Sequence, residues 1–297
     1  MNHILITGGS GFIGRHLVKT LEQDHKVSVL SRNPGKNGEF EWNFEKGVFP
    51  VHLLEEADAV IHLAGTPINK GRWNARNKAK IIDSRVKSAG FLFEKLKAGP
   101  GKVKVFVSAS GIGYYGEAGE MLVREDDAPG EDFLACVCQE WENAARQFSN
   151  LGIKVVCIRT GLVLSAKGGI LPVMAKPVLW GAGSPLGTGR QYMSWVHIDD
   201  LCSIYRKAVT DPEMHGPYNA VAPQPVTNLE FTKALAHALH RPLWLPKVPA
   251  GILRLVLGEK ADLVLLGQRA SSEKIQQSGY QFKYNKLEEA LKKEYSS

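Results

Sequence analysis

The chain has 297 residues, of which 44% are hydrophobic and 23% are charged. These values are ordinary for a packed soluble protein and exclude a mainly disordered chain. The length fits two domains or one large α/β unit. No run of about 18 or more apolar residues occurs, and the N-terminus lacks the pattern of a signal peptide. We therefore expect a cytoplasmic protein without a membrane partner.

Basic residues outnumber acidic ones by 37 to 30, which gives a net charge of +7. The excess favours anionic small molecules over nucleic acid, because the chain has no long block of like charge and no nucleic-acid-binding motif. The densest basic stretch, Asn69 to Lys80, is interpreted as the solvated face of a helix.

The four cysteines form no Cys-x-x-Cys pair and lie among apolar residues. This arrangement argues against structural zinc and against a disulfide framework, and it favours a reducing compartment. The chain also lacks Gly-x-Ser-x-Gly, His-Glu-x-x-His and EF-hand patterns, so neither a hydrolase nor a metal site is expected.

Short apolar runs alternate with helical patterns in the first half of the chain. The spacing predicts strands over 3–7, 26–31, 58–65, 102–108 and 153–158, with a weaker one near 40–42. It predicts helices beginning at 12, over 73–97 and over 133–149. This alternation is typical of a doubly wound, Rossmann-type parallel sheet of the α/β class.

The character of the sequence changes after Leu164. Residues 165–192 are rich in glycine and proline, and helical patterns follow over 199–210, 228–240 and most of 249–295, with a short strand over 217–221. We therefore predict a Rossmann domain over 1–164 and a smaller, mostly helical substrate lobe over 165–297. The alternative that 193–225 returns to the first domain stays open.

The most specific motif is the glycine pattern from Thr7 to Gly14, which lies between a predicted strand and a predicted helix. Gly8 would permit a tight turn, Gly11 would let a pyrophosphate approach the backbone, and Gly14 would allow the helix to pack closely. The start of the helix would supply amide donors and the positive end of its dipole. The pattern predicts a dinucleotide-binding loop that also includes Ser10, Phe12 and Ile13.

The end of the second predicted strand indicates which dinucleotide is bound. NAD-binding loops usually carry a carboxylate there, but this strand ends in Ser31 and Arg32. A carboxylate would repel a 2′-phosphate, whereas a serine can donate to it and an arginine can pair with it. We therefore expect NADP(H) as the cofactor.

Several spaced motifs resemble those of the extended short-chain dehydrogenase/reductases. They are the glycine pattern, Asp58-x-Val-Ile-His-Leu-Ala-Gly65, Val107-Ser-Ala-Ser110 with Gly116, and Trp195-Val-His-Ile-Asp-Asp-Leu201. Additional features narrow the resemblance to the atypical "epimerase family protein" subfamily, the 39U type, whose C-terminal domain has no known function. These features are Arg72-Trp73, Ser84-Arg85, Tyr114-Tyr115-Gly116, Trp141-Glu142, Arg159-Thr-Gly161, Gly258-Glu259 and Gly267-Gln-Arg269.

The resemblance implies a role for individual positions. Leu63 and Ala64 would line the adenosine side of the cofactor, Arg85 would face the cofactor cleft, and Leu162 would pass near the nicotinamide. Ser110 matches the family serine that hydrogen-bonds a substrate oxygen.

The chain departs from the family in its catalytic pair, which is normally Tyr-x-x-x-Lys. No such pattern occurs, and aligning Glu142 with the usual glutamate places Leu134 and Cys138 at the two positions. A phenol from Tyr114 or Tyr115, or a water held by Ser110, is the expected substitute, and we choose Ser110 and Tyr114 as the catalytic candidates. His197 is the reserve, since its setting is common at structural corners.

The resulting hypothesis is an NADP(H)-binding oxidoreductase or epimerase-like protein. The expected reaction is reduction of a carbonyl group on a small molecule, and a homodimer is the possible oligomeric state. The alternative hypothesis is a catalytically weak NADPH-binding sensor or scaffold.

Overall fold

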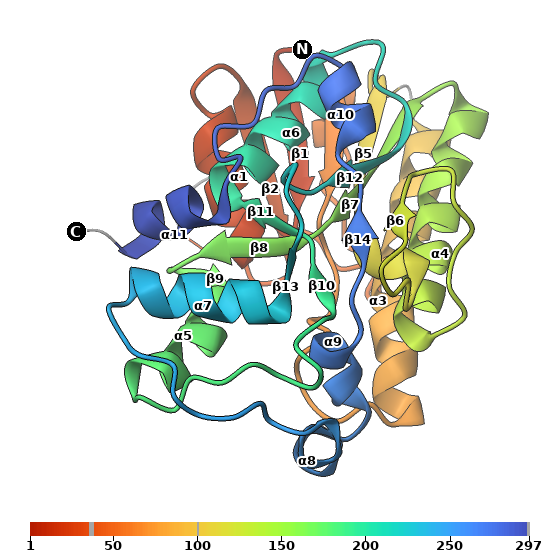
Figure 1. Ribbon diagram of the computed structural model, residues 1–297. Helices are drawn as coiled ribbons and strands as arrows, with labels where there is room; N and C mark the ends of the chain where they lie inside the picture. The colour runs from red at the N-terminus through yellow and green to blue at the C-terminus, as the bar shows by residue number, and fades with distance from the viewer. Residues whose placement is uncertain (36–38, 100, 296–297) are drawn as a thin grey trace.

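The structure is a computed structural model that describes residues 1–35, 39–99 and 101–295. A seven-stranded sheet runs in the order β12-β7-β5-β4-β1-β2-β3, and every neighbouring pair is parallel (Figure 1). The strands are β1 (His3–Thr7), β2 (Lys26–Ser31), β3 (Glu39–Glu41), β4 (Ala59–His62), β5 (Val105–Gly111), β7 (Lys154–Thr160) and β12 (Gly216–Ala220). The predicted α/β class and parallel sheet are confirmed.

Helices cover both faces of this sheet, because alternate residues of each strand point to opposite sides. Ile4 and Ile6 of β1 pack in one core with α1 (Phe12–Leu21) and α6 (Ile198–Thr210). Leu5, between them, packs in the other core, with α2 (His52–Glu56), α3 (Ala75–Ala98), α4 (Phe133–Arg146) and the 3₁₀ helix η2 (Gln147–Leu151). Both faces of the sheet are therefore buried, which explains why the strand sequences are continuous apolar runs.

The way α1 begins distinguishes it from α3 and α4, the long helices on the other face of the sheet. The Asn74 side chain caps α3 by accepting from the Asn77 amide, and Asp132 caps α4 by accepting from the Ala135 amide. In α1 the capping position is Gly11, which offers no side-chain acceptor, and the first turn contains no acidic residue. The amides at this helix start are therefore not capped by a side chain.

The glycine- and proline-rich segment is more regular than predicted. The segment and the residues on either side of it form β8 (Leu162–Ser165), β9 (Gly168–Gly169), α5 (Leu171–Leu179), β10 (Tyr192–Met193) and β11 (Trp195–His197). In α5, Pro172 lies in the first turn, where a proline costs no hydrogen bond, and Leu171, Ala175 and Val178 form one buried face. That face packs in a third core with β13 (Val226–Thr227) and α7 (Asn228–Ala238).

The C-terminal region is less helical than predicted. The helices α8 (Ala250–Leu257), η3 (Gly258–Ala261, a 3₁₀ helix) and α9 (Asp262–Leu265) follow one another directly, and non-helical segments then separate α9 from α10 (Glu273–Gln277) and α10 from α11 (Leu287–Tyr295). One of them forms β14 (Arg269–Ala270), which pairs with β6 (Leu122–Val123) beyond the 3₁₀ helix η1 (Ile112–Tyr115). Meanwhile β12 extends the main sheet, so the segment 193–225 contributes a strand to it. In the described ranges, no helix is both long enough and apolar enough to cross a membrane.

Candidate functional site

The glycine loop lies tightly against the end of β4. Gly8 has a φ of +73°, and a Cβ placed on it would lie 2.9 Å from the backbone of Leu63 and Ala64. A Cβ on Gly14 would lie 2.3 Å from the Gly8 carbonyl oxygen. These contacts leave no room for larger residues, and they place Leu63 and Ala64 beside the loop.

The side chains of the other residues expected in the loop, Ser10, Phe12 and Ile13, lie in different surroundings. The ring of Phe12 packs against the β9 backbone, since a Cβ on Gly168 would lie 2.4 Å from its Cδ2. Ser10 is exposed, and its carbonyl accepts a hydrogen bond from Arg15. Ile13 lines the cavity described below. An uncapped helix start after a glycine turn is a site suited to a phosphate.

The end of β2 carries the two residues expected to meet a 2′-phosphate. Ser31 is buried, and its hydroxyl donates to the carbonyl of Asn33 over 3.2 Å. Arg32, the next residue, is exposed. Three features of this region fit a phosphorylated dinucleotide. The glycine loop from Thr7 to Gly14, which we call the cofactor cradle, leaves no room for side chains at its glycines, the start of α1 has no acidic residue, and a basic residue follows β2.

His62 supports the loop from behind, at the end of β4. Its Nδ1 lies 2.7 Å from the Thr7 hydroxyl, and its Nε2 lies 3.0 Å from the Ser88 hydroxyl. The Ser88 hydroxyl donates to the carbonyl of Ser84, so Nε2 carries the proton and Nδ1 accepts from Thr7. Burial lowers the pKa of His62 to about 4 and keeps the ring neutral.

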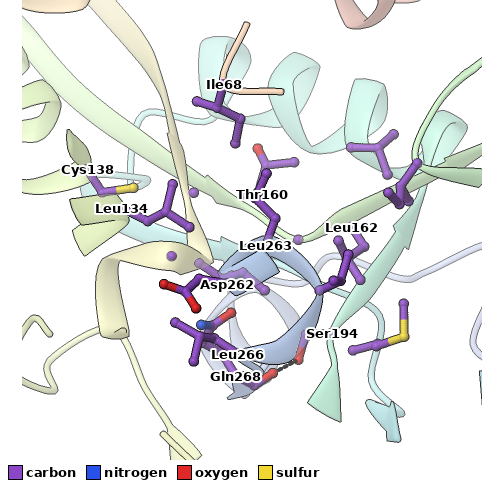
Figure 2. A pocket seen from close by; sticks show the side chains of 18 of the residues that line it. Ile68, Leu134, Cys138, Thr160, Leu162, Ser194, Asp262, Leu263, Leu266 and Gln268 are labelled. Carbon is purple, nitrogen blue, oxygen red and sulfur yellow. Dashed lines mark hydrogen bonds between the residues drawn. The ribbon is translucent and has the colours of Figure 1, made fainter. Parts of the chain in front are cut away.

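A cavity of about 350 Å³ opens at the carboxyl ends of β5 and β7. Figure 2 shows Leu134 and Cys138 of α4 on one side of it and Leu162 of β8 on the other. Residues of α9 and the segment after it, among them Leu263 and Leu266, complete the wall. Most lining side chains are apolar, so the site suits a small ligand with few polar groups.

Ser110, at the end of β5, lines this cavity and is fixed by a buried ion pair. Its hydroxyl donates to Glu142 over 2.8 Å, and Glu142 accepts from the Nε and Nη2 of Arg159 over 2.8 and 3.0 Å. Burial alone would lower the pKa of Arg159, but the Glu142 carboxylate outweighs it and raises that pKa. Ser110 is therefore held by a charged network that runs between β7 and α4.

The two adjacent tyrosines belong to this network and not to the cavity. The ring of Tyr114 lies 3.5 Å from the Arg159 guanidinium carbon, and Tyr115 donates to Asn219 over 2.7 Å. Neither residue lines the cavity. The geometry thus does not support the expectation that Tyr114 supplies a phenol there, because the cation–π contact with Arg159 holds its ring elsewhere.

Leu134 and Cys138, the residues at the positions of the missing catalytic pair, do line the cavity. Burial raises the pKa of the Cys138 thiol to about 11, so it is protonated at neutral pH. A leucine and a neutral thiol cannot perform the proton transfer that a tyrosine and a lysine would provide. His197 offers no substitute, since it begins α6 and pairs with Glu294 over 3.0 Å, away from the cavity.

Several other polar residues line the cavity, and Arg85 and Tyr192 are the two of them that matter for its chemistry. Arg85, expected to face the cofactor cleft, lines it and is 7% exposed. Tyr192 of β10 also lines it, and no local motif points to this residue, because it is not followed by a lysine four residues later and lies far from Ser110 in the sequence. The backbone of Tyr192 packs against Gly267, which is far away in the sequence. A Cβ added to Gly267 would lie 2.5 Å from the Tyr192 amide nitrogen. Among the residues the structure describes, no group of three or more potential ligands could hold a metal ion.

Comparisons with known proteins agree with this architecture. The model of the NAD dependent epimerase/dehydratase family matches residues 4–221. The chain belongs to this family. A second model, a domain of unknown function (DUF1731), matches residues 248–294.

Relatives cover nearly the whole chain. The epimerase family protein YfhF of Bacillus subtilis is 39% identical over 295 residues, covering 97% of this chain and 96% of the relative. A chloroplastic homologue of SDR39U1 from Arabidopsis thaliana is 37% identical, covering 97% of this chain and 85% of the relative. Membership of the epimerase family protein subfamily is confirmed.

Solved structures show the same fold. The crystal structure of human epimerase family protein SDR39U1 with NADPH superposes with a TM-score of 0.91 at 32% identity, covering 99% of both chains. UDP-glucose 4-epimerase from Thermotoga maritima, solved with UDP-glucose, reaches 0.78 at 22% identity, covering 99% of this chain and 97% of that one. At this low identity, the similarity to UDP-glucose 4-epimerase shows only a shared fold.

Proposed function

We propose that the protein is an NADP(H)-binding oxidoreductase that reduces a carbonyl group on a small, mostly apolar molecule. The observation that carries the proposal is that the glycine loop and the cavity adjoin each other. Ile13, in the first turn after the glycine loop, lines the same cavity as Ser110. A dinucleotide held by its phosphates on the loop would therefore extend to the cavity.

The residues at the adenosine end support NADP(H) rather than NAD(H). Gly8, Gly11 and Gly14 would admit the pyrophosphate, while Ser31 and Arg32 would receive the 2′-phosphate. The human relative solved with NADPH has the same fold over its whole length. When bound, NADPH supplies a hydride; the binding and the proton transfer fall to the chain itself.

Within the cavity, Ser110 would hold the substrate oxygen. The hydroxyl hydrogen of Ser110 is donated to Glu142, so it would have to turn from Glu142 to a substrate carbonyl oxygen, which can only accept, while Glu142 keeps its hydrogen bonds from Arg159. The apolar lining would exclude water from the reacting carbonyl.

Tyr192 would supply the proton, since it is the one tyrosine among the described residues that line the cavity, and its ring centre lies 5.2 Å from the Arg269 guanidinium carbon. A phenol holds its proton at neutral pH and donates it to a developing alkoxide more readily than it accepts one. This favours carbonyl reduction over a full epimerase cycle, which needs transfer in both directions.

One observation favours a second candidate, an NADPH-binding sensor or scaffold. The positions of the missing catalytic pair carry Leu134 and a neutral thiol, Cys138, and both face the cavity. A protein that holds NADPH without consuming it would tolerate this loss.

Single-turnover oxidation of bound NADPH separates the two candidates. Purified protein loaded with NADPH is mixed with a panel of apolar ketones and aldehydes, and the absorbance of the reduced nicotinamide is followed. We expect at least one class of carbonyl compound to be reduced. Tight NADPH binding with no oxidation beyond the buffer control would establish the sensor instead.

A further inference from the structure

Arg85 of α3 is a buried cation whose hydrogen bonds are incomplete. Nη1 of Arg85 donates to the carbonyl oxygen of Thr66 over 3.1 Å and to that of Ile81 over 2.8 Å. Its Nε is buried and has no partner among the described residues. The guanidinium carbon lies 4.6 Å from the centre of the Trp141 ring. One edge of the guanidinium is thus left without an acceptor.

The charge of Arg85 also lacks a partner in the cavity wall. Burial lowers the pKa of Arg85 to about 10, which still leaves it charged at neutral pH. Asp262 is the sole carboxylate among the described residues of the wall, and it lies 3.7 Å from Arg254. An uncompensated buried charge is costly, and an anionic ligand would offset that cost.

We propose that the substrate of the cavity carries a single carboxylate, which pairs with the guanidinium of Arg85, while its apolar remainder packs against the wall. This inference rests on the proposed function and narrows its substrate to oxo acids. Both Nη1 hydrogens are donated to carbonyls and the Nε is buried, so Nη2 is the nitrogen left to meet the carboxylate. Ile68, Leu134 and Leu263 provide the apolar contacts.

The rest of the wall argues for a small acid and against a sugar nucleotide. Arg85 is the one lysine or arginine among the described lining residues, so a diphosphate would lack a second cation. The volume of about 350 Å³ must also admit the nicotinamide end of the cofactor. A compact ligand with one anionic group fits both constraints.

Arg85 and Ser110 line the same cavity, and both contact α4, Arg85 through Trp141 and Ser110 through Glu142. An oxo acid in the cavity would place its carboxylate on Arg85 and its carbonyl oxygen on Ser110.

The test measures binding without turnover, in the presence of NADP⁺. The probes are 2-oxohexanoate and its methyl ester, which differ by one charge, and binding is followed by calorimetry and by tryptophan fluorescence. The variants are Arg85→Met, which removes the charge, Arg85→Lys, which keeps it, and Arg72→Met as an exposed control. Melting curves establish that each variant is folded.

We expect wild-type protein and Arg72→Met to bind the acid at least about tenfold more tightly than the ester, the scale of one charged hydrogen bond. Arg85→Met should abolish the preference, and Arg85→Lys should keep part of it. An ester bound as tightly as the acid by wild type, or an undiminished preference in Arg85→Met, would overturn the inference.

A measurement of NADPH affinity distinguishes failure of the carboxylate inference from failure of the proposed function. We expect Arg85→Met to bind NADPH about as tightly as wild type. A tenfold loss would place Arg85 in the cofactor site and overturn the substrate assignment, although the protein would still be an NADPH-binding protein. Absence of NADPH binding by the wild type would instead contradict the proposed function.

Discussion

At the scale of single residues, the proposed chemistry depends on which hydroxyl groups reach the cavity. Ser110 and Tyr192 line it, whereas the ring of Tyr114 stacks on Arg159 outside it. Tyr192→Phe and Tyr114→Phe each remove one phenolic oxygen and therefore form a matched pair.

We expect Ser110→Ala to slow single-turnover NADPH oxidation by about tenfold or more, and Tyr192→Phe by about 10²-fold or more, as for loss of a general acid. Tyr114→Phe should leave the rate near that of wild type. Wild-type rates in both cavity variants would place the chemistry elsewhere.

A second prediction concerns His62, the neutral histidine behind the glycine loop. Its pKa is about 4 in the folded protein and near 6.5 in the unfolded chain, so below pH 6.5 the unfolded state binds the extra proton. Stability should therefore fall as the pH is lowered from about 6.5 to about 4, by roughly 3 kcal/mol in total from this group.

Denaturant unfolding of wild type and His62→Gln across this range measures the effect. The variant cannot be protonated at this position, so its unfolding free energy should decline less steeply with falling pH. Equal slopes for the two proteins would show that His62 is not the group responsible.

At the scale of elements, the turn from β1 to α1 requires glycine for reasons of space. A Cβ on Gly14 would lie 2.3 Å from the Gly8 oxygen and 2.6 Å from the Gly9 Cα. Gly14→Ala should therefore move the loop and weaken NADPH binding by about tenfold or more, measured by calorimetry. Gly90→Ala in α3 is the control, because nothing lies within 4 Å of the added Cβ. Normal NADPH affinity in Gly14→Ala would refute the role of this turn.

The ion pair between β7 and α4 predicts a large effect on stability. Glu142 and Arg159 are 1% and 2% exposed, so removing one charge leaves the other buried without compensation. Glu142→Gln should lower the unfolding free energy by about 3–5 kcal/mol in denaturant titrations. Glu140→Gln, on the exposed side of the same helix, should change it little. Equal stability of the two variants would contradict this account of the network.

The elements that sequence could predict are those with strong local patterns. The run Ile4 to Ile6 followed by Gly8 indicates a buried strand and a turn, and both are present. By contrast, α5 was missed because Pro172 and Pro177 look like helix breakers, although a long-range core stabilises the helix. Local propensity could not reveal that packing.

The candidate site shows the same limit. The glycine loop and Ser110 follow from short motifs, and the structure places Ser110 at the cavity. Tyr192 could not be found in this way, because it reaches the wall through β10 and contacts with the segment after α9. Tyr114 seemed close to Ser110 in sequence, but the Arg159 contact that withdraws it comes from another strand.

At the scale of the whole molecule, a cofactor cradle at one end of the sheet meets a cavity whose wall comes from both halves of the chain. The division into domains at residue 164 stays a prediction, since β12 joins the main sheet. The central claim is that this cradle holds a cofactor with a 2′-phosphate.

Calorimetric titration of NADPH and NADH into wild type and Arg32→Ala tests that claim most directly. Wild type should prefer NADPH, and Arg32→Ala should weaken NADPH binding by about 1.5–3 kcal/mol, the scale of a charge-assisted contact, while leaving NADH binding almost unchanged. Equal losses for the two cofactors, or a wild-type preference for NADH, would contradict the account.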